Sequence, residues 1–254
     1  MDKVKKLEKY LVYQPKVDFN TLEIIGMEAL VRFVDINSGE ILNTEEIVNS
    51  IENIDDIIGL TSDVINIILL DMKILESMNC NIDISINISS KELCSTKFIR
   101  LIDEKFKSYE SYINKIEIEI TENYKIEEVS IMRQNISYLK DKGFSISIDD
   151  LGSGFNQIDM IKKYDVDLVK IDKSMVKNFH KKQDYLKYII YICRKRNIKL
   201  LVEGIESKED FDKFLDLGIE FGQGYYFYKP MKLCELIKMT GFLMDIKLLK
   251  NNSI

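Results

Sequence analysis

Two adjacent carboxylates, Asp149 and Asp150, are the residues of this sequence best suited to chemistry. They end a segment, residues 144–149, in which apolar and polar side chains alternate with the period of a β-strand, and a Gly-Ser-Gly turn follows. Two ionised carboxylates side by side repel each other unless a cation neutralises them. The pair is therefore either an exposed acidic turn or a divalent-metal site at the end of a strand, depending on what other strands bring there.

Other predicted strands carry polar side chains in the same alternating pattern. Side chains alternate across a strand, so the Ile residues of segments 82–88 and 116–120 can pack against helices. The polar side chains between them, here called the polar lane of each strand, can then point into a barrel. Barrel interiors are normally apolar, so a charged lane is costly unless its groups bind a cation or one another. One such strand could hold a structural ion pair, but several strands ending alike predict a site at the C-terminal mouth of a barrel. The polar residues concerned are Asp83, Ser85, Asn87, Glu117, Glu119, Asp149, Lys170 and Glu203.

The elements that must position these residues alternate between strand and helix. Residues 11–19 and 24–34 form a predicted hairpin, and a helical stretch over 44–77 is broken near 53–55. Repeated strand–helix units over about 250 residues favour an α/β fold, a modified TIM-type (β/α)8 barrel with one antiparallel strand in the opening hairpin. The other expected strands are 82–88, 115–121, 144–149, 167–171, 199–203 and 219–221, and the other expected helices are 91–109, 126–142, 157–163, 185–196 and 208–217.

The two ends of the chain flank this barrel. Residues 1–9 are expected to form a short lead-in helix or a linker stub, and residues 10–254 a single barrel domain. Within that domain, residues 232–254 suit a closing helix, or two helices broken at Gly241. A partner-binding tail is the alternative for this last segment.

Composition and charge narrow the possible functions. The 254 residues carry a formal net charge of −6, which argues against sequence-independent binding to long nucleic acid. No apolar run approaches the ~20 residues that span a bilayer, and no signal peptide is visible. The 4 cysteines are scattered and suggest reduced thiols, so a cytoplasmic location is expected. The only histidine, His180, lies in a Lys-rich segment and is interpreted as a surface residue.

A series of short motifs follows in a fixed order over roughly residues 10–231. The motifs are Tyr13-Gln14-Pro15, Glu28-Ala29-Leu30-Val31-Arg32, Ser85-Ile86-Asn87-Ile88-Ser89, Glu119-Ile120-Thr121-Glu122, Asp149-Asp150-Leu151-Gly152-Ser153-Gly154, Val169-Lys170-Ile171-Asp172, Glu203-Gly204-Ile205-Glu206 and Gln223-Gly224-Tyr225. In this order the chain resembles the EAL domain family of cyclic di-GMP phosphodiesterases. Each motif alone is weak, whereas the ordered set is very specific.

The resemblance implies an enzyme with two Mg²⁺ or Mn²⁺ ions that hydrolyses cyclic di-GMP to linear 5′-pGpG. It assigns one ion to four ligands and makes Asp149 a bridge to the second ion. The first set is Glu28, Asn87, Glu119 and Asp149, and the second is Asp149, Asp150 and Glu203. Two ions about 3.5–4 Å apart stabilise both the attacking and the leaving oxygen of a phosphodiester, and hard ions prefer such oxygen ligands.

The remaining roles also come from the resemblance. Lys170 would hydrogen-bond the nucleophilic water, Gln223 would complete the water network, and Glu203 is alternatively the general base. Arg32 would meet a phosphate oxygen. The substrate-binding set is Gln14, Leu30, Arg32 and Asp172, and the residues that would anchor the loop after Asp150 are Glu122 and Ser153.

That loop departs from the family pattern, since Leu151 replaces a Phe and Asn156-Gln157 replaces a Ser pair. No metal ligand is missing, so activity is expected, and the departures bear on its rate or its dependence on a homodimer. One alternative is a catalytically weak or inactive cyclic di-GMP receptor that signals to a protein partner. Another is an unrelated two-metal barrel enzyme. No membrane segment is expected within this chain, and a sensory or regulatory domain could lie outside it.

Overall fold

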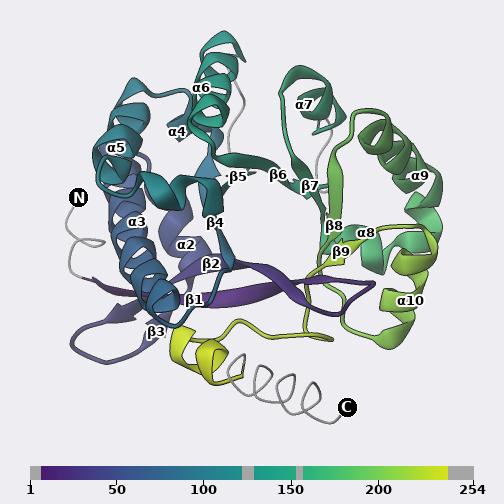
Figure 1. Ribbon diagram of the computed structural model, residues 1–254, viewed down its shortest axis with the longest axis horizontal. Coiled ribbons are helices and arrows are strands. Elements are labelled where there is room, and N and C mark those ends of the chain that lie inside the picture. The colour runs from purple at the N-terminus through teal and green to yellow at the C-terminus, as the bar shows by residue number, and fades with distance from the viewer. Residues whose placement is uncertain (1–6, 122–128, 153–156, 240–254) are drawn as a thin grey trace.

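The computed structural model describes residues 7–121, 129–152 and 157–239, which form a closed eight-stranded barrel surrounded by helices (Figure 1). The strands are β1 (Leu7–Asp18), β2 (Ile24–Asp35), β3 (Ile41–Leu42), β4 (Asp83–Ser89), β5 (Ile116–Thr121), β6 (Ser145–Leu151), β7 (Leu168–Ile171), β8 (Lys199–Val202) and β9 (Phe221–Gly222). The helices are α2 (Thr44–Asn49), α3 (Ile54–Ser77), α4 (Ser90–Leu93), α5 (Thr96–Phe106), η1 (Glu110–Lys115), α6 (Val129–Lys142), α7 (Gln157–Lys163), α8 (Lys173–Lys177), α9 (Phe179–Lys195) and α10 (Lys208–Asp216). The strand order β1-β9-β8-β7-β6-β5-β4-β2 is closed by pairing of β1 with β2, with β3 outside the barrel beside β2. The predicted α/β barrel is confirmed.

The opening hairpin supplies the predicted antiparallel strand. β1 runs antiparallel to both of its neighbours, β2 and β9, and its pairing with β2 starts at Leu7 opposite Asp35. Residues 7–9 therefore belong to β1, and the expectation of a lead-in helix or linker there is wrong. The pairing partner lies far along the chain, so the local sequence carries little sign of it. Residues 1–6 lie outside the described part.

Alternation along the strands divides the barrel into an apolar outer layer and a polar interior. Ile84, Ile86 and Ile118 are buried in the core that the helices cover, and each such side chain contributes about 1.5–3 kcal/mol when fully buried. The interior lane of the same strands is polar yet equally buried, with Ser85 and Glu119 at 1% and 0% exposure. The predicted polar lanes therefore do point inward.

The helices mostly match the expected ranges, but η1 and α8 were not expected, and the expected helix 91–109 is divided into α4 and α5. The predicted break near residues 53–55 is present, because Asn53 caps the N-terminus of α3 by accepting a hydrogen bond from the Asp55 amide. Helix α9 begins at Phe179 rather than at 185. The charged start of α9 obscures its apolar period, and a helix as short as α8 has little period of its own.

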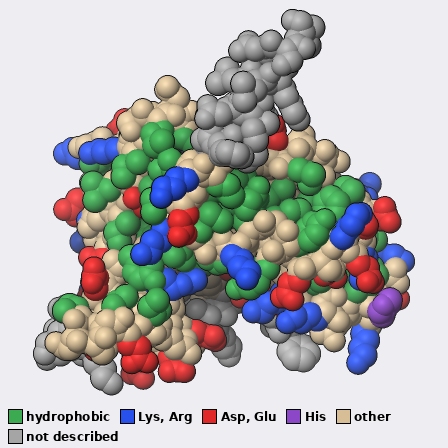
Figure 2. Space-filling view, turned by 90° about the horizontal axis from the view of Figure 1, so that it is seen from below, with side chains coloured by type: hydrophobic (Ala, Val, Ile, Leu, Met, Phe, Trp, Pro, Cys, Tyr) green, Lys and Arg blue, Asp and Glu red, His purple; other side chains and the backbone are tan. Residues whose placement is uncertain are grey.

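The C-terminal part of the barrel domain packs under the hairpin (Figure 1). Met231 pairs with Tyr13 of β1, and residues 233–239 are helical. The possible break at Gly241 and the rest of residues 240–254 lie outside the described part. Among residues 7–121, 129–152 and 157–239, no helix has the length and apolarity needed to cross a bilayer. On the face seen in Figure 2, basic and acidic side chains are interspersed rather than gathered by sign.

Candidate metal centre

Two overlapping sets of carboxylates meet at the mouth of the barrel. Glu28 (β2), Glu119 (β5) and Asp149 (β6) each offer an oxygen within 4.8 Å of the others, and Asp149, Asp150 and Glu203 form a second set by the same measure. Asp149 belongs to both sets. Parallel strands in register bring these side chains together at one end, since Asn87 of β4 stands beside Glu119 of β5.

A backbone irregularity in β6 allows the adjacent residues Asp149 and Asp150 to contribute carboxylates to the same set. In a regular strand, Asp149 and Asp150 would point to opposite faces. Asp150 has φ 55°, in the left-handed region that few residues other than glycine adopt, and the pairing with β7 shifts register between Ile148 and Leu151. Asp149 is buried while Asp150 is exposed at the rim. Strain of this kind persists only when the surroundings hold it, and it is frequent at functional sites.

Lys170 lies at the centre of the acidic group. Its Nζ is 2.8 Å from Glu119 Oε2, 2.8 Å from Glu203 Oε1 and 2.9 Å from Asp149 Oδ1, and it also contacts Glu28 at 3.3 Å. Burial of the ammonium lowers its pKa, but the four carboxylates outweigh that effect and raise the pKa of Lys170 well above the ordinary value. Lys170 is therefore charged and neutralises part of the site.

The amide side chains of the site each leave an oxygen unsatisfied. Asn87 donates from Nδ2 to Glu28 Oε1 at 2.8 Å, and its buried Oδ1 has no hydrogen-bond partner among the described residues. Gln223 donates from Nε2 to Glu28 Oε2 (2.8 Å) and to Gln14 Oε1 (3.0 Å). An unpaired buried carbonyl oxygen beside three carboxylates is the donor set that a hard divalent cation prefers, so the residues fit Mg²⁺ or Mn²⁺.

The electrostatics of the site show an excess of negative charge. Burial raises the pKa of Asp149 well above its usual value, and neighbouring carboxylates add to the effect while Lys170 opposes it. Burial likewise raises the pKa of Glu203 to about 7. By contrast, Lys16 and Lys170 overcome the burial of Glu119 and lower its pKa. The connected charges are the carboxylates Glu28, Glu117, Glu119, Asp149, Asp150 and Glu203 and the ammonium groups Lys16 and Lys170.

Lys16 is the member of this network that the sequence reasoning missed. It donates to Glu117 and Glu119 from the opposite side of the barrel. A signal was available, because Lys16 lies two residues after Gln14 on a predicted strand and so shares its lane.

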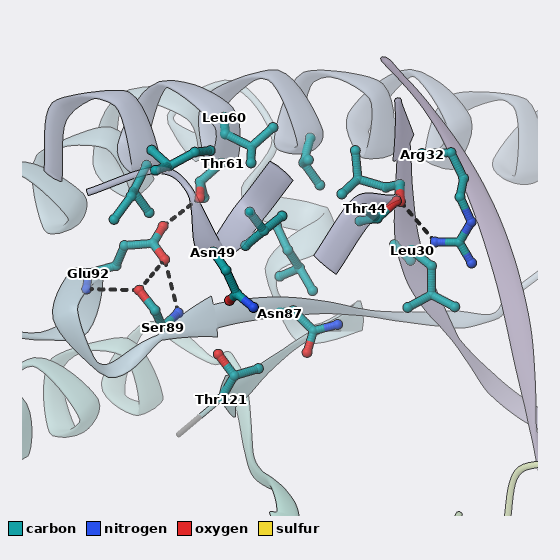
Figure 3. Close-up of a pocket in the computed structure, with 17 residues that line it drawn as sticks. Leu30, Arg32, Thr44, Asn49, Leu60, Thr61, Asn87, Ser89, Glu92 and Thr121 are labelled. Atoms are coloured by element: carbon teal, nitrogen blue, oxygen red, sulfur yellow. Dashed lines mark hydrogen bonds between the residues drawn. The ribbon is translucent and has the colours of Figure 1, made fainter. Parts of the chain in front are cut away.

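Two of the expected substrate-binding residues line a pocket next to the metal centre (Figure 3). This cavity of about 220 Å³ lies between β2, β4, α2 and α3, and Leu30, Arg32 and Asn87 are on its wall. Glu92 is at another part of the wall, where it accepts hydrogen bonds from Ser89 and Thr61. Most of the lining is apolar, and the pocket wall also carries the Arg32 guanidinium, which donates to the Val31 carbonyl oxygen at 2.8 Å, and Asn87 of the metal centre.

The other expected residues lie elsewhere or outside the description. Gln14 is beside Gln223 and donates to the Tyr228 carbonyl oxygen at 3.2 Å. Asp172 is not on the pocket wall: it caps α8 by accepting a hydrogen bond from the Ser174 amide. The loop-anchoring residues Glu122 and Ser153 lie outside the described residues.

Comparison with known proteins agrees with this geometry. The model of the family described as "EAL domain" matches residues 2–230. The chain is 28% identical over 234 residues to the probable cyclic di-GMP phosphodiesterase PdeG of Escherichia coli (strain K12), covering 89% of this chain and 45% of that protein. It is 29% identical to the cyclic di-GMP phosphodiesterase PdeA of Borreliella burgdorferi, covering 89% of this chain and 36% of that protein.

The fold has solved relatives as well. The crystal structure of an EAL domain protein from Listeria monocytogenes EGD-e superposes with a TM-score of 0.78 at 29% identity, covering 92% of this chain and 93% of that one. The chain spans less than half the length of the two curated relatives, 45% and 36%. Because the family model matches nearly the whole barrel, this chain belongs to the EAL domain family.

Proposed function

We propose that this chain is a two-metal-dependent phosphodiesterase that hydrolyses cyclic di-GMP to linear 5′-pGpG. The observation that carries the proposal is the pair of carboxylate sets sharing Asp149 at the barrel mouth, beside a pocket that contains Arg32. Two relatives are named as cyclic di-GMP phosphodiesterases, which supports this substrate.

The charge of the network supports two cations rather than one. Six carboxylates and two ammonium groups leave a formal charge of −4 when all are ionised, which two divalent cations balance. The first cation is assigned to Glu28, Asn87, Glu119 and Asp149, and the second to Asp149, Asp150 and Glu203. When bound, such ions activate water and stabilise charge on the attacking and leaving oxygens of the phosphodiester.

The protein's own side chains perform the remaining tasks. Lys170 donates hydrogen bonds to Glu28 and Glu119 at the centre of the acidic group, where it would also orient the attacking water. Burial raises the pKa of Glu203 to about 7, so this residue could accept the proton of that water in addition to serving as a ligand. Gln223 is held by Glu28 and Gln14 and completes the hydrogen bonds around the water.

Substrate contacts are assigned to residues around the mouth. Arg32 on the pocket wall meets a phosphate oxygen, and the apolar wall near Leu30 accommodates part of the nucleotide. Gln14 assists from beside Gln223. Asp172, which caps α8 directly after the strand that carries Lys170, is also assigned to substrate binding.

The test is a product assay with purified protein, cyclic di-GMP and either Mg²⁺ or Mn²⁺. We expect 5′-pGpG from the wild type and a loss of about 10²-fold or more in turnover for Glu28→Ala, since a ligand of the first cation is removed. Glu40→Ala is the matched control, because Glu40 is an exposed carboxylate just after the same strand.

Two results would count against the proposal. Folded protein that forms no product with either ion is not a phosphodiesterase. Tight binding of cyclic di-GMP in Ca²⁺ without turnover in Mg²⁺ would instead identify a receptor that signals to a partner.

We also propose that the domain works in the cytoplasm as a homodimer, with sensory or regulatory input from outside this chain. The presence of relatives more than twice as long as the chain supports external input. Sedimentation of the purified protein, with and without cyclic di-GMP, tests the dimer.

A further inference from the structure

A buried lysine on the antiparallel strand supports the acidic centre from below. Lys16 of β1 is only 3% exposed. Its Nζ lies 2.8 Å from Glu119 Oε1 and 3.0 Å from Glu117 Oε1, both on β5. It therefore reaches across the barrel interior from β1 to β5.

Glu119 is consequently held at both of its oxygens. Lys16 binds Oε1, and Lys170 binds Oε2 at 2.8 Å. Lys170 is shared among four carboxylates, whereas Lys16 bonds only Glu117 and Glu119 among the described residues. Because Glu119 is fully buried, an oxygen without such a donor would be left unsatisfied in the barrel.

We propose that Lys16 is a positioning residue for the metal centre: it fixes the carboxylate of Glu119 in the orientation in which that residue binds a divalent cation. The inference rests on the proposed function, because it assumes that Glu119 is a ligand. Groups that hydrogen-bond a ligating carboxylate orient it, and their loss typically lowers metal affinity by about 10–100-fold.

The rest of the network keeps Lys16 in this role. The Ser147 hydroxyl donates to Glu117 Oε1 at 2.6 Å, so the second carboxylate that receives Lys16 is itself held in place. Two carboxylates within 3.0 Å compensate the buried ammonium charge of Lys16. A charged donor gives a shorter and stronger hydrogen bond to a carboxylate than a neutral one.

Metal binding separates positioning from a purely structural ion pair. Mn²⁺ is titrated into the full chain and the free ion is followed by electron paramagnetic resonance. We expect Lys16→Met to raise the Kd for Mn²⁺ by about 10–100-fold and to change the spectrum of the bound ion. Turnover should then recover in part at high Mn²⁺, because excess ion refills the weakened site.

Lys9→Met is the matched control. Lys9 lies on the same strand and forms an ion pair of 2.9 Å with Asp63 of α3, away from the barrel interior. It should bind Mn²⁺ like the wild type. If Lys16→Met fails to fold, it is replaced by the double variant Lys16→Met/Glu117→Gln, which removes one charge of each sign. The conservative variant Lys16→Arg should keep most of the wild-type affinity for Mn²⁺.

The possible results separate the role of Lys16 from the proposed phosphodiesterase function on which it rests. Wild-type protein that binds Mn²⁺ and hydrolyses cyclic di-GMP, with the same Mn²⁺ affinity in the Lys16 and Lys9 variants, would overturn the role of Lys16 alone. Wild-type protein that binds no Mn²⁺ would overturn both.

Discussion

At the scale of single residues, Lys170 supplies the positive charge that compensates the buried carboxylates when no cation is bound. It is completely buried and contacts all four of the carboxylates closest to it. Removing one partner of a buried ion pair is far more costly than removing an exposed one, because the remaining charge loses its compensation. In the proposed mechanism, the same ammonium orients the attacking water.

Lys170→Met should therefore reduce both stability and activity, and the two effects should respond differently to Mn²⁺. We expect the free energy of unfolding in a chelator to fall by roughly 3–5 kcal/mol. Added Mn²⁺ should restore much of it, since the cations replace the lost positive charge. Turnover should stay about 10²–10³-fold below the wild type, because the donor to the water is absent.

Denaturant unfolding and the product assay measure these effects. Lys140→Met is the control, because Lys140 forms ion pairs with Asp165 and Asp167 at the surface and such pairs contribute about 0–1 kcal/mol. Turnover of Lys170→Met within a few-fold of the wild type would remove Lys170 from the mechanism.

The site residues differ in how far the sequence could predict them. Glu119 and Asp149 were found because a charged lane on a buried strand is costly and therefore informative. The position of Asp150 depends on a register shift in β6, and local alternation does not predict such a shift. Asp172 was assigned to substrate binding only through the resemblance to the EAL family; its side chain caps helix α8, and its contact with substrate stays a prediction.

At the scale of elements, the turn after β9 explains why glycine follows Gln223. A Cβ built on Gly224 would lie 2.2 Å from the carbonyl oxygen and 2.4 Å from the amide nitrogen of Ile205. These are backbone atoms, so the clash can be relieved only if the segment moves. Because Gln223 is the adjacent residue, the movement would pull its amide away from Glu28 and Gln14.

Gly224→Ala should consequently destabilise the protein by about 1–3 kcal/mol and lower turnover by more than the loss of folded protein explains. Gly59→Ala is the contrasting control: no atom lies within 4 Å of its new Cβ, and alanine favours the helix α3 by up to about 1 kcal/mol. Thermal unfolding and turnover per folded molecule are compared. Equal behaviour of the two variants would contradict the packing argument.

The elements themselves were largely predictable, because most barrel strands and helices carry clear periods of two or 3.6 residues. The start of β1 was not, since residues 7–9 become a strand only through pairing with residues near Asp35. Helix α8 was missed because its few residues follow directly on the cap at Asp172. Short or edge elements depend on contacts that a local pattern does not contain.

At the scale of the whole molecule, closure of the barrel concentrates negative charge that the chain keeps apart in sequence. Glu28 comes from the opening hairpin and Glu203 follows the penultimate barrel strand, yet both contact Lys170. The folded state brings these carboxylates together and the unfolded chain does not, so cations that bind the mouth bind the folded state preferentially. Folding and metal binding should therefore be linked.

Divalent cations should stabilise the protein in a way that depends on Asp149. At an ion concentration about 100 times Kd, one site adds about 2.7 kcal/mol, which corresponds to a rise in Tm of roughly 5–10 °C for a domain of this size. Two filled sites should approach twice that value. Asp149→Asn should lose most of the rise because Asp149 belongs to both carboxylate sets, whereas Asp150→Asn should keep the part due to the first set. Thermal unfolding of the three proteins in Mn²⁺ and in chelator gives the comparison, and an equal rise in all three would mean that the ions stabilise the protein somewhere other than the barrel mouth.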